Sequence, residues 1–200
     1  ILGGTFDPLH NGHLQTVKDV RQALSLSSVH VIPNAQPPHR QRPLLAAEQR
    51  FSLVNKALQA EQGLIADDSE VSRGGISYMC DTLAALKKTH TEQNLCLIIG
   101  MDAYNNFCRW HQWPQILELA HLIVMRRAGV DAKPDHALAA RVVADQQQLL
   151  LVDAGLVYFQ QVSQLEISST LIRQRVKANE DIQNLVPELS RQDIQTLYKG

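Results

Sequence analysis

The chain opens with Ile1-Leu2-Gly3-Gly4-Thr5-Phe6-Asp7-Pro8-Leu9-His10-Asn11-Gly12-His13, and this stretch decides the fold. An apolar start is followed by a glycine turn, and a helical pattern begins where the turn ends. A strand that ends in a glycine turn and runs into a helix presents backbone N–H groups and the positive end of the helix dipole. The stretch therefore predicts a phosphate-binding turn between a first strand and a first helix.

Two histidines, His10 and His13, stand in this turn. Imidazoles beside a phosphate stabilise its oxygens as charge shifts in a transition state. The same pair could instead chelate a transition metal, or only cap and pack the helix. The glycines favour the phosphate, because they let the backbone approach a ligand closely, which a metal site does not require. We expect Asp7-Pro8 to fix the turn, with the carboxylate bonded to nearby backbone.

The rest of the chain alternates short apolar runs with amphipathic segments. This alternation predicts an α/β fold, a Rossmann-like parallel sheet with helices on both faces. After the strand at 1–2, the apolar runs predict strands at 29–32, 95–99, 122–125 and 156–159. The amphipathic segments predict helices at 13–24, 46–59, 78–88, 114–120 and 169–178, and we expect a final helix near the C-terminus.

Composition bounds the function. The 200 residues are 44% hydrophobic with a formal net charge of −1, which predicts one domain over residues 1–200. The charge gives no overall attraction to nucleic acid or to an anionic membrane, so we expect neither partner, and any anion site must be local. The three cysteines lack CxxC spacing, which argues against a disulfide framework or a zinc ribbon. No run approaches the roughly 18 apolar residues of a membrane span. We expect a cytoplasmic monomer or homo-oligomer.

A second polar cluster, Ser168-Ser169-Thr170, opens the helix predicted at 169–178, and Arg173 follows one turn later. Ser168 is a good N-cap, and a cap needs no ligand. The N–H groups and hydroxyls of such a helix start could also hold an anion within reach of the arginine. The residues alone leave both interpretations open.

Polar side chains also follow the other predicted strands. His39 and Arg40 end a proline-rich loop after the strand at 29–32, and Asp102 follows the next strand. Ligands of parallel α/β sheets bind beyond the carboxyl ends of the strands, so these residues are candidates for phosphate and ribose contacts. Solvated loops are the alternative. Trp110 could stack on a flat heteroaromatic ring, although most tryptophans belong to a core.

Taken together, the motifs resemble one family. GGTFDPxHxGH, PxxxPPHR, SYxxxTL, GxD, RWHQW, HLIVMRR and ISSTLIR occur from Gly3 to Tyr198 in the order and about the spacing of bacterial nicotinate-nucleotide adenylyltransferases. HxGH alone marks only the wider nucleotidyltransferase superfamily. PPHR, GxD and ISSTLIR together narrow the resemblance to this one family. The resemblance implies a Rossmann-like enzyme of NAD biosynthesis. Such an enzyme makes nicotinate adenine dinucleotide and diphosphate from ATP and nicotinate mononucleotide, with magnesium.

The resemblance also implies roles for individual residues. The implied catalytic residues are His10, His13 and Arg173. The implied ATP-binding residues are Gly3, Gly4, Thr5, Phe6, His13, Asp102, Ser168, Ser169, Thr170 and Arg173. The implied contacts of nicotinate mononucleotide are Thr5, His39, Arg40, Met79, Trp110 and His111. No protein metal site is implied, because Mg²⁺ would bridge phosphate oxygens of the bound ATP.

Two positions depart from the family pattern. Where the family usually reads SYT, this chain has Ser77-Tyr78-Met79, and His111 replaces what is often an aromatic residue. Both changes fall on the expected nicotinate side and leave the ATP motifs untouched. The acceptor could therefore be nicotinamide mononucleotide or another phosphomonoester. A second alternative is a fragment of a class I aminoacyl-tRNA synthetase, which would need a KMSKS-type lysine loop. The third alternative is a non-catalytic nucleotide- or metal-binding protein.

Overall fold

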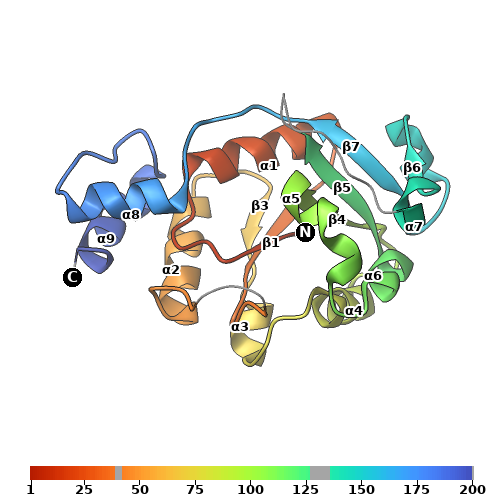
Figure 1. Ribbon diagram of the computed structural model, residues 1–200, viewed down its shortest axis with the longest axis horizontal. Coiled ribbons are helices and arrows are strands. Elements are labelled where there is room, and N and C mark those ends of the chain that lie inside the picture. The colour runs from red at the N-terminus through yellow and green to blue at the C-terminus, as the bar shows by residue number, and fades with distance from the viewer. Residues whose placement is uncertain (39–41, 127–135, 200) are drawn as a thin grey trace. The chain divides into compact units, whose positions relative to one another are not determined.

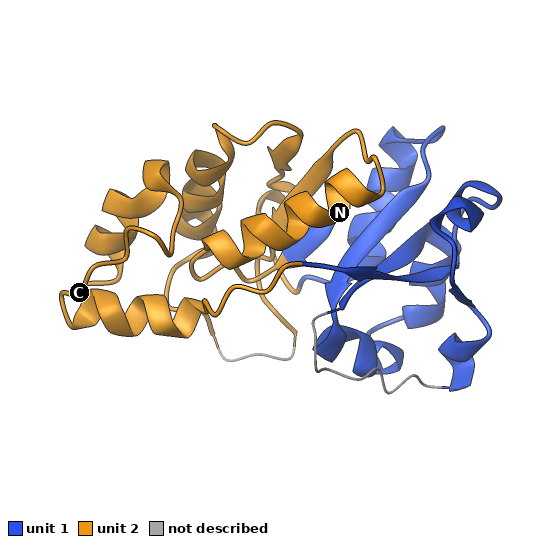
Figure 2. Ribbon diagram, turned by 90° about the horizontal axis from the view of Figure 1, so that it is seen from above, with its two compact units in different colours: residues 1–3, 77–162 blue, residues 4–76, 163–200 orange. Residues whose placement is uncertain are grey.

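The computed structural model describes residues 1–38, 42–126 and 136–199. The chain divides into two compact units, which we call unit 1 (residues 1–3 and 77–162) and unit 2 (residues 4–76 and 163–200) (Figure 2). Helices alternate with strands along much of the chain (Figure 1), and the strand pairs within each unit are parallel. The α/β prediction is therefore confirmed, while the single domain over residues 1–200 stays a prediction.

Unit 1 is built on parallel strands in the order β1-β4-β5-β7-β6. Their bounds are β1 Leu2–Gly4, β4 Leu95–Gly100, β5 Ala120–Arg126, β6 Val142–Val143 and β7 Val157–Gln161. β4 and β5 pair along the whole of β4, from Leu95 opposite Ala120 to Gly100 opposite Met125. Their central side chains are almost fully buried, which explains why both strands read as continuous apolar runs.

The helices of unit 1 match the predicted segments closely where they are long. They are α4 Met79–Thr89, α5 Met101–Asn105, α6 Trp113–Leu119 and α7 His136–Ala139, with 3₁₀ helices η1 Phe107–Arg109 and η2 Gln146–Leu150. α4 and α6 lie within one residue of the predictions at 78–88 and 114–120. No sequence pattern indicated α5, α7 and the very short strand β6, because elements of so few residues show no hydrophobic period.

Unit 2 pairs β2 (Val29–Pro33) with β3 (Leu64–Ala66). Its helices are α1 Asn11–Ala23, α2 Ala47–Leu58, α3 Ser69–Arg73, α8 Ser169–Lys177 and α9 Glu188–Leu197. The three helices α2, α8 and α9 share one apolar core, which contains Leu53, Ile172, Val176, Ile194 and Tyr198. The predicted strand at 29–32 and the helices at 46–59 and 169–178 are confirmed, and α9 is the expected final helix.

Two expectations drawn from composition can be compared with the structure. Cys80, Cys96 and Cys108 all lie within the described residues, and none is disulfide-bonded. Within the described ranges, no helix has the length and apolar character needed to cross a membrane.

Candidate active site

The turn after β1 is shaped by Gly4 and Phe6. Phe6 has a φ of 48°, in the left-handed region that residues other than glycine rarely adopt. Its ring is buried, and a Cβ added to Gly4 would lie only 2.8 Å from the ring atom Cζ. Because a buried ring cannot swing away cheaply, glycine is required at position 4. A strained backbone of this kind clusters at ligand sites, in agreement with the predicted phosphate-binding turn.

His10 and His13 form a reciprocal cap at the start of helix α1, in which each ring accepts the backbone N–H of the other residue. The N–H of His13 donates to Nδ1 of His10, and the N–H of His10 donates to Nδ1 of His13, each at 3.3 Å. The two rings stack with their centroids 3.7 Å apart. An imidazole whose Nδ1 accepts a hydrogen bond carries the proton of its neutral form on Nε2. Capping therefore fixes both rings as Nε2–H donors, so the capping and phosphate-binding interpretations are compatible.

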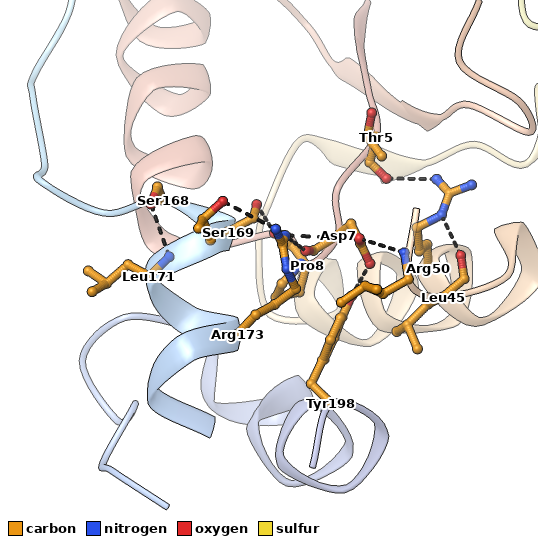
Figure 3. A network of polar contacts seen from close by, with 12 residues as sticks. Thr5, Asp7, Pro8, Leu45, Arg50, Ser168, Ser169, Leu171, Arg173 and Tyr198 are labelled. Carbon is orange, nitrogen blue, oxygen red and sulfur yellow. Dashed lines mark hydrogen bonds and ion pairs between the residues drawn. The ribbon is translucent and has the colours of Figure 1, made fainter. Parts of the chain in front are cut away.

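Helix α8 is tied to the same turn (Figure 3). Ser168 is the N-cap, as predicted, and its Oγ accepts the N–H of Leu171 at 3.1 Å. The hydroxyl of Ser169 donates to the backbone oxygen of Pro8 at 2.9 Å. This bond uses the hydroxyl proton, so Ser169 can donate to a phosphate only through its backbone N–H. The positive end of α8 thus lies beside the glycine turn.

Arg173 reaches the turn from one helical turn further along α8. Its Nη1 donates to the backbone oxygen of Asp7 at 2.7 Å, and its Nη2 donates to Oγ1 of Thr170 at 3.2 Å. Nη1 also lies 3.9 Å from the carboxylate atom Oδ2 of Asp7. The Arg173 side chain is 25% exposed. A guanidinium has five N–H donors, so these contacts orient the group without using all of them.

Asp7 connects the turn to two distant segments, which corrects the expectation that its carboxylate bonds nearby backbone. Oδ2 accepts the N–H of Leu44 at 3.0 Å, and Oδ1 accepts the hydroxyl of Tyr198 at 2.5 Å. The carboxylate is nearly buried and needs such donors. Burial, followed by the hydrogen bond and charge of Asp7, raises the pKa of Tyr198 well above its usual value, so the phenol stays a proton donor.

Arg50 of α2 holds the turn from inside, and sequence reasoning missed it. The residue is 1% exposed. Nη1 donates to the backbone oxygen of Thr5 at 2.7 Å, Nη2 to that of Asn34 at 2.7 Å, and Nε to that of Leu45 at 3.2 Å. Burial lowers the pKa of Arg50, against the attraction of Asp7. Figure 3 shows the guanidinium between Thr5 and Leu45. Arg50 thus joins the loops that follow β1 and β2.

Unit 1 contains three of the predicted contacts of nicotinate mononucleotide, Met79, Trp110 and His111. Met79 is the first residue of α4, and its Cε would lie 2.6 Å from a Cβ added to Gly3. The ring of His111 packs against Tyr78, with centroids 4.2 Å apart and the planes tilted by 32°. The two departures from the family pattern are therefore close together in unit 1, because His111 packs on Tyr78, the residue directly before Met79.

Asp102 and Trp110 also belong to unit 1. Asp102 is exposed in the first turn of α5, directly after β4. Trp110 is half-buried and packs on Phe107 with ring centroids 5.4 Å apart, so part of its ring surface serves the fold. His39 and Arg40 lie outside the described residues. The described part of the chain contains no group of three or more His, Cys, Asp or Glu residues that could hold a metal ion.

The predicted site residues therefore fall into two sets. Unit 2 brings together the turn, the two histidines and the start of α8, which supply the residues Gly4, Thr5, Phe6, His10, His13, Ser168, Ser169, Thr170 and Arg173. Unit 1 holds Gly3, Met79, Asp102, Trp110 and His111. The residues that the sequence did not single out are Arg50 and Tyr198, both in unit 2.

Comparison with known proteins agrees with this architecture. A family model described as cytidylyltransferase-like matches residues 1–175. The probable nicotinate-nucleotide adenylyltransferase of Methylococcus capsulatus is 38% identical over 193 residues, which cover 94% of this chain and 92% of the relative. The corresponding protein of Acidithiobacillus ferrooxidans is 39% identical over 207 residues and covers 100% of this chain and 95% of its own.

Solved structures show the same fold at lower identity. Plasmodium falciparum nicotinic acid mononucleotide adenylyltransferase complexed with NaAD matches with a TM-score of 0.70 at 16% identity, over 98% of this chain and 93% of that one. The same enzyme complexed with APC gives a TM-score of 0.69 at 17% identity, over 98% and 94%. These matches confirm the predicted nucleotidyltransferase fold. With the sequence relatives, they show that the chain belongs to the cytidylyltransferase-like family and, within it, to the nicotinate-nucleotide adenylyltransferases, nucleotidyltransferases of NAD biosynthesis.

Proposed function

We propose that this protein transfers the adenylyl group of ATP directly to nicotinate mononucleotide. An oxygen of the mononucleotide phosphate attacks the α-phosphorus, the bond from that phosphorus to the β-phosphate oxygen breaks, and diphosphate leaves. A phosphate nucleophile is already ionised at neutral pH, so the reaction needs no general base. Catalysis then consists of positioning and of stabilising charge on the phosphates.

The observation that carries the proposal is the linkage of the glycine turn to helix α8. The bonds from Ser169 to Pro8 and from Arg173 to Asp7 bring two sets of anion-binding groups to one place in unit 2. In our mechanism Gly4, Thr5 and the Nε2–H of His13 hold the reacting phosphates, with His10 assisting. Backbone N–H groups at the start of α8 hold the β- and γ-phosphates.

Arg173 and Thr170 act on the leaving group in this mechanism. Diphosphate gains negative charge as it departs, and a guanidinium stabilises it by charge-assisted hydrogen bonds. Arg173 is oriented by Thr170 and by the Asp7 carbonyl, and its partial exposure allows contact with a ligand. Thr170 accepts from Arg173 through Oγ1, so its own hydroxyl proton is suited to a phosphate oxygen.

Mg²⁺ fits this site as a companion of ATP rather than as a protein-held ion. The carboxylate of Asp7, the acidic residue within the turn, already accepts bonds from Leu44 and Tyr198. Oxygen ligands for the ion would therefore come chiefly from the triphosphate, as is usual for Mg²⁺. When bound, the ion supplies charge neutralisation to the phosphates. Arg173 and the backbone N–H groups at the start of α8 would add to this neutralisation by their own contacts with the phosphates.

The remaining roles follow the resemblance. Asp102 would accept a ribose hydroxyl, Trp110 would stack on the nicotinate ring, and Met79 and His111 would also contact the mononucleotide. His39 or Arg40 would meet the phosphate of the mononucleotide. The structural neighbours are complexes with NaAD and with APC, which supports nucleotide substrates for this chain. Because both proposed substrates are intracellular metabolites, we propose a cytoplasmic location.

One assay tests the function. The protein is incubated with ATP, Mg²⁺ and either nicotinate or nicotinamide mononucleotide, and the products are identified by mass spectrometry and by diphosphate release. We expect nicotinate adenine dinucleotide and one equivalent of diphosphate. Nucleotide binding without diphosphate release would contradict the proposal and indicate a nucleotide-binding protein. Exclusive use of nicotinamide mononucleotide would mean that the amide, and not nicotinate mononucleotide, is the acceptor.

A further inference from the structure

The carboxylate of Asp7 accepts hydrogen bonds from two distant segments and lies near the guanidinium of a third, helix α8. Leu44 donates to Oδ2 and Tyr198 donates to Oδ1, at 3.0 and 2.5 Å. Arg173, the cation of the site, stays 3.9 Å from Oδ2 and gives its short bond to the backbone oxygen of Asp7 instead. Both of these hydrogen bonds to the carboxylate come from neutral donors (Figure 3), while the buried guanidinium of Arg50 attracts it through its charge.

This arrangement matters because Asp7 and ATP would compete for Arg173. A nearly buried carboxylate without hydrogen bonds attracts a neighbouring guanidinium strongly, and a bidentate pair would form where the geometry allows. Two neutral donors reduce this attraction, since they stabilise the carboxylate without the cation. The N–H groups of Arg173 then remain available to a phosphate.

We propose that Tyr198 is a positioning residue for the polyphosphate of ATP, which acts by bonding Asp7 and so keeping Arg173 out of a close ion pair. The inference rests on the proposed function for the identity of the ligand. It adds a contribution from the segment after α9, which lies beyond the residues 1–175 that the family model matches.

The surroundings of Tyr198 suit this role. Its side chain is 3% exposed and packs in the apolar core shared by α2, α8 and α9, which holds the ring in place. Burial keeps the phenol protonated, so the group donates over the whole working range of pH. Arg173 comes from α8 and Asp7 from the turn, and Tyr198 therefore acts where these two segments meet.

Tyr198→Phe tests the proposal, because it removes the hydroxyl and keeps the buried ring. Binding of ATP and of AMP is measured by calorimetry, together with kcat and the KM for ATP. We expect ATP to bind about three- to tenfold more weakly, since part of one charge-assisted contact is lost. The Kd for AMP, which lacks the β- and γ-phosphates, should change less than about twofold by the same reasoning. Equal weakening of both ligands, or unchanged ATP binding, would overturn the proposal.

Tyr104→Phe is the matched control. The hydroxyl of Tyr104 is as deeply buried, with the residue 1% exposed, and it has no hydrogen-bond partner among the described residues. Loss of this hydroxyl should leave the ratio of ATP to AMP affinity as in the wild type. A shift in the ratio like that of Tyr198→Phe would show a general effect of removing a buried hydroxyl and would count against the proposal.

Asp7→Asn shows whether Tyr198 acts through the carboxylate. Asparagine removes the charge that competes for Arg173, so adding Tyr198→Phe to Asp7→Asn should leave ATP affinity unchanged. The same loss in both backgrounds would mean that Tyr198 acts by another route and would overturn the inference. Failure of wild-type protein to form the dinucleotide would instead reject the proposed function, while the binding comparison would still decide the role of Tyr198.

Discussion

His10 and His13 each accept the backbone N–H of the other through Nδ1, and their rings stack 3.7 Å apart. The same two residues therefore start helix α1 and present Nε2–H donors. An alanine substitution removes both properties at once. A substitution that keeps the cap and removes the imidazole separates them.

His13→Gln is such a change, because glutamine at the third helical position also reaches back to the N–H of the cap residue. We expect kcat to fall about 100-fold or more in both His13→Gln and His13→Ala, as when an oxyanion donor is lost. ATP affinity should change far less. The alanine variant alone should also lose about 0.5–1.5 kcal/mol of stability, because the N–H of His10 loses its acceptor. Steady-state kinetics and thermal melts measure these effects, and near-normal turnover of either folded variant would remove His13 from catalysis.

Arg173→Ala removes the proposed contact with the departing phosphates. Binding of ATP should weaken more than binding of AMP, which ends at the α-phosphate, because a hydrogen bond to a charged group contributes about 1.5–3 kcal/mol. Arg173→Lys retains the charge but not the fork of donors, and should lie between alanine and wild type. Calorimetry with both nucleotides provides the measurement. If the two ligands lose affinity equally, Arg173 serves only to tie Asp7 to α8.

Met79→Thr introduces the residue that the family usually has. A hydroxyl here could bond the nicotinate carboxylate. If backbone N–H groups carry most of the recognition, this one bond changes the selectivity for nicotinate over nicotinamide mononucleotide by about tenfold at most. We expect the wild type to prefer nicotinate over nicotinamide mononucleotide, and Met79→Thr to sharpen that preference only modestly. The kcat/KM values of both substrates with both proteins decide this. If the wild type preferred the amide, the proposed acceptor would be wrong, but the proposed adenylyl transfer would still hold.

Asp67 controls part of the acid stability of unit 2. Its carboxylate bonds Nδ1 of His30 at 2.8 Å and the N–H of Ser69 at 2.9 Å. These bonds, the one to His30 first, outweigh burial and lower the pKa of Asp67 to about 2. A lowered carboxylate pKa stabilises the folded state above the unfolded value of 3.8, and this stabilisation is lost as pH falls towards 2. Asp67→Asn should cost about 2 kcal/mol at pH 7 and flatten the decline of stability between about pH 4 and 2, measured by urea unfolding. An unchanged pH profile would contradict it.

The sequence predicted those features that local pattern determines. The apolar runs located β2, β4, β5 and β7, and the glycines, histidines and Ser168 marked the turn and the cap. These properties depend on neighbours within one helical turn or one strand. The contacts of Asp7 do not, because its partners Leu44 and Tyr198 lie 37 and 191 residues away.

Arg50 shows the same limit. It occupies a position on the apolar face of α2, with Leu53, Val54 and Ala57 at the following i+3, i+4 and i+7 positions, and all of them are buried. An arginine at that spacing is a signal for a buried cation, but its partners are backbone oxygens outside the helix, those of Thr5, Asn34 and Leu45. Sequence alone identifies no such acceptor, since every residue carries one.

The bonds from Arg50 to Thr5 and to Asn34 make one guanidinium the common anchor of two loops. A loop of this kind cannot detach alone without leaving a buried cation short of acceptors, which is costly. Local opening of the two segments should therefore be a single event with one free energy. Native-state hydrogen exchange would record it as matching protection of amides on both loops, and Arg50→Lys would lower the protection of both together. The turn after β1 and the loop that begins at Asn34 would then behave as one cooperative unit.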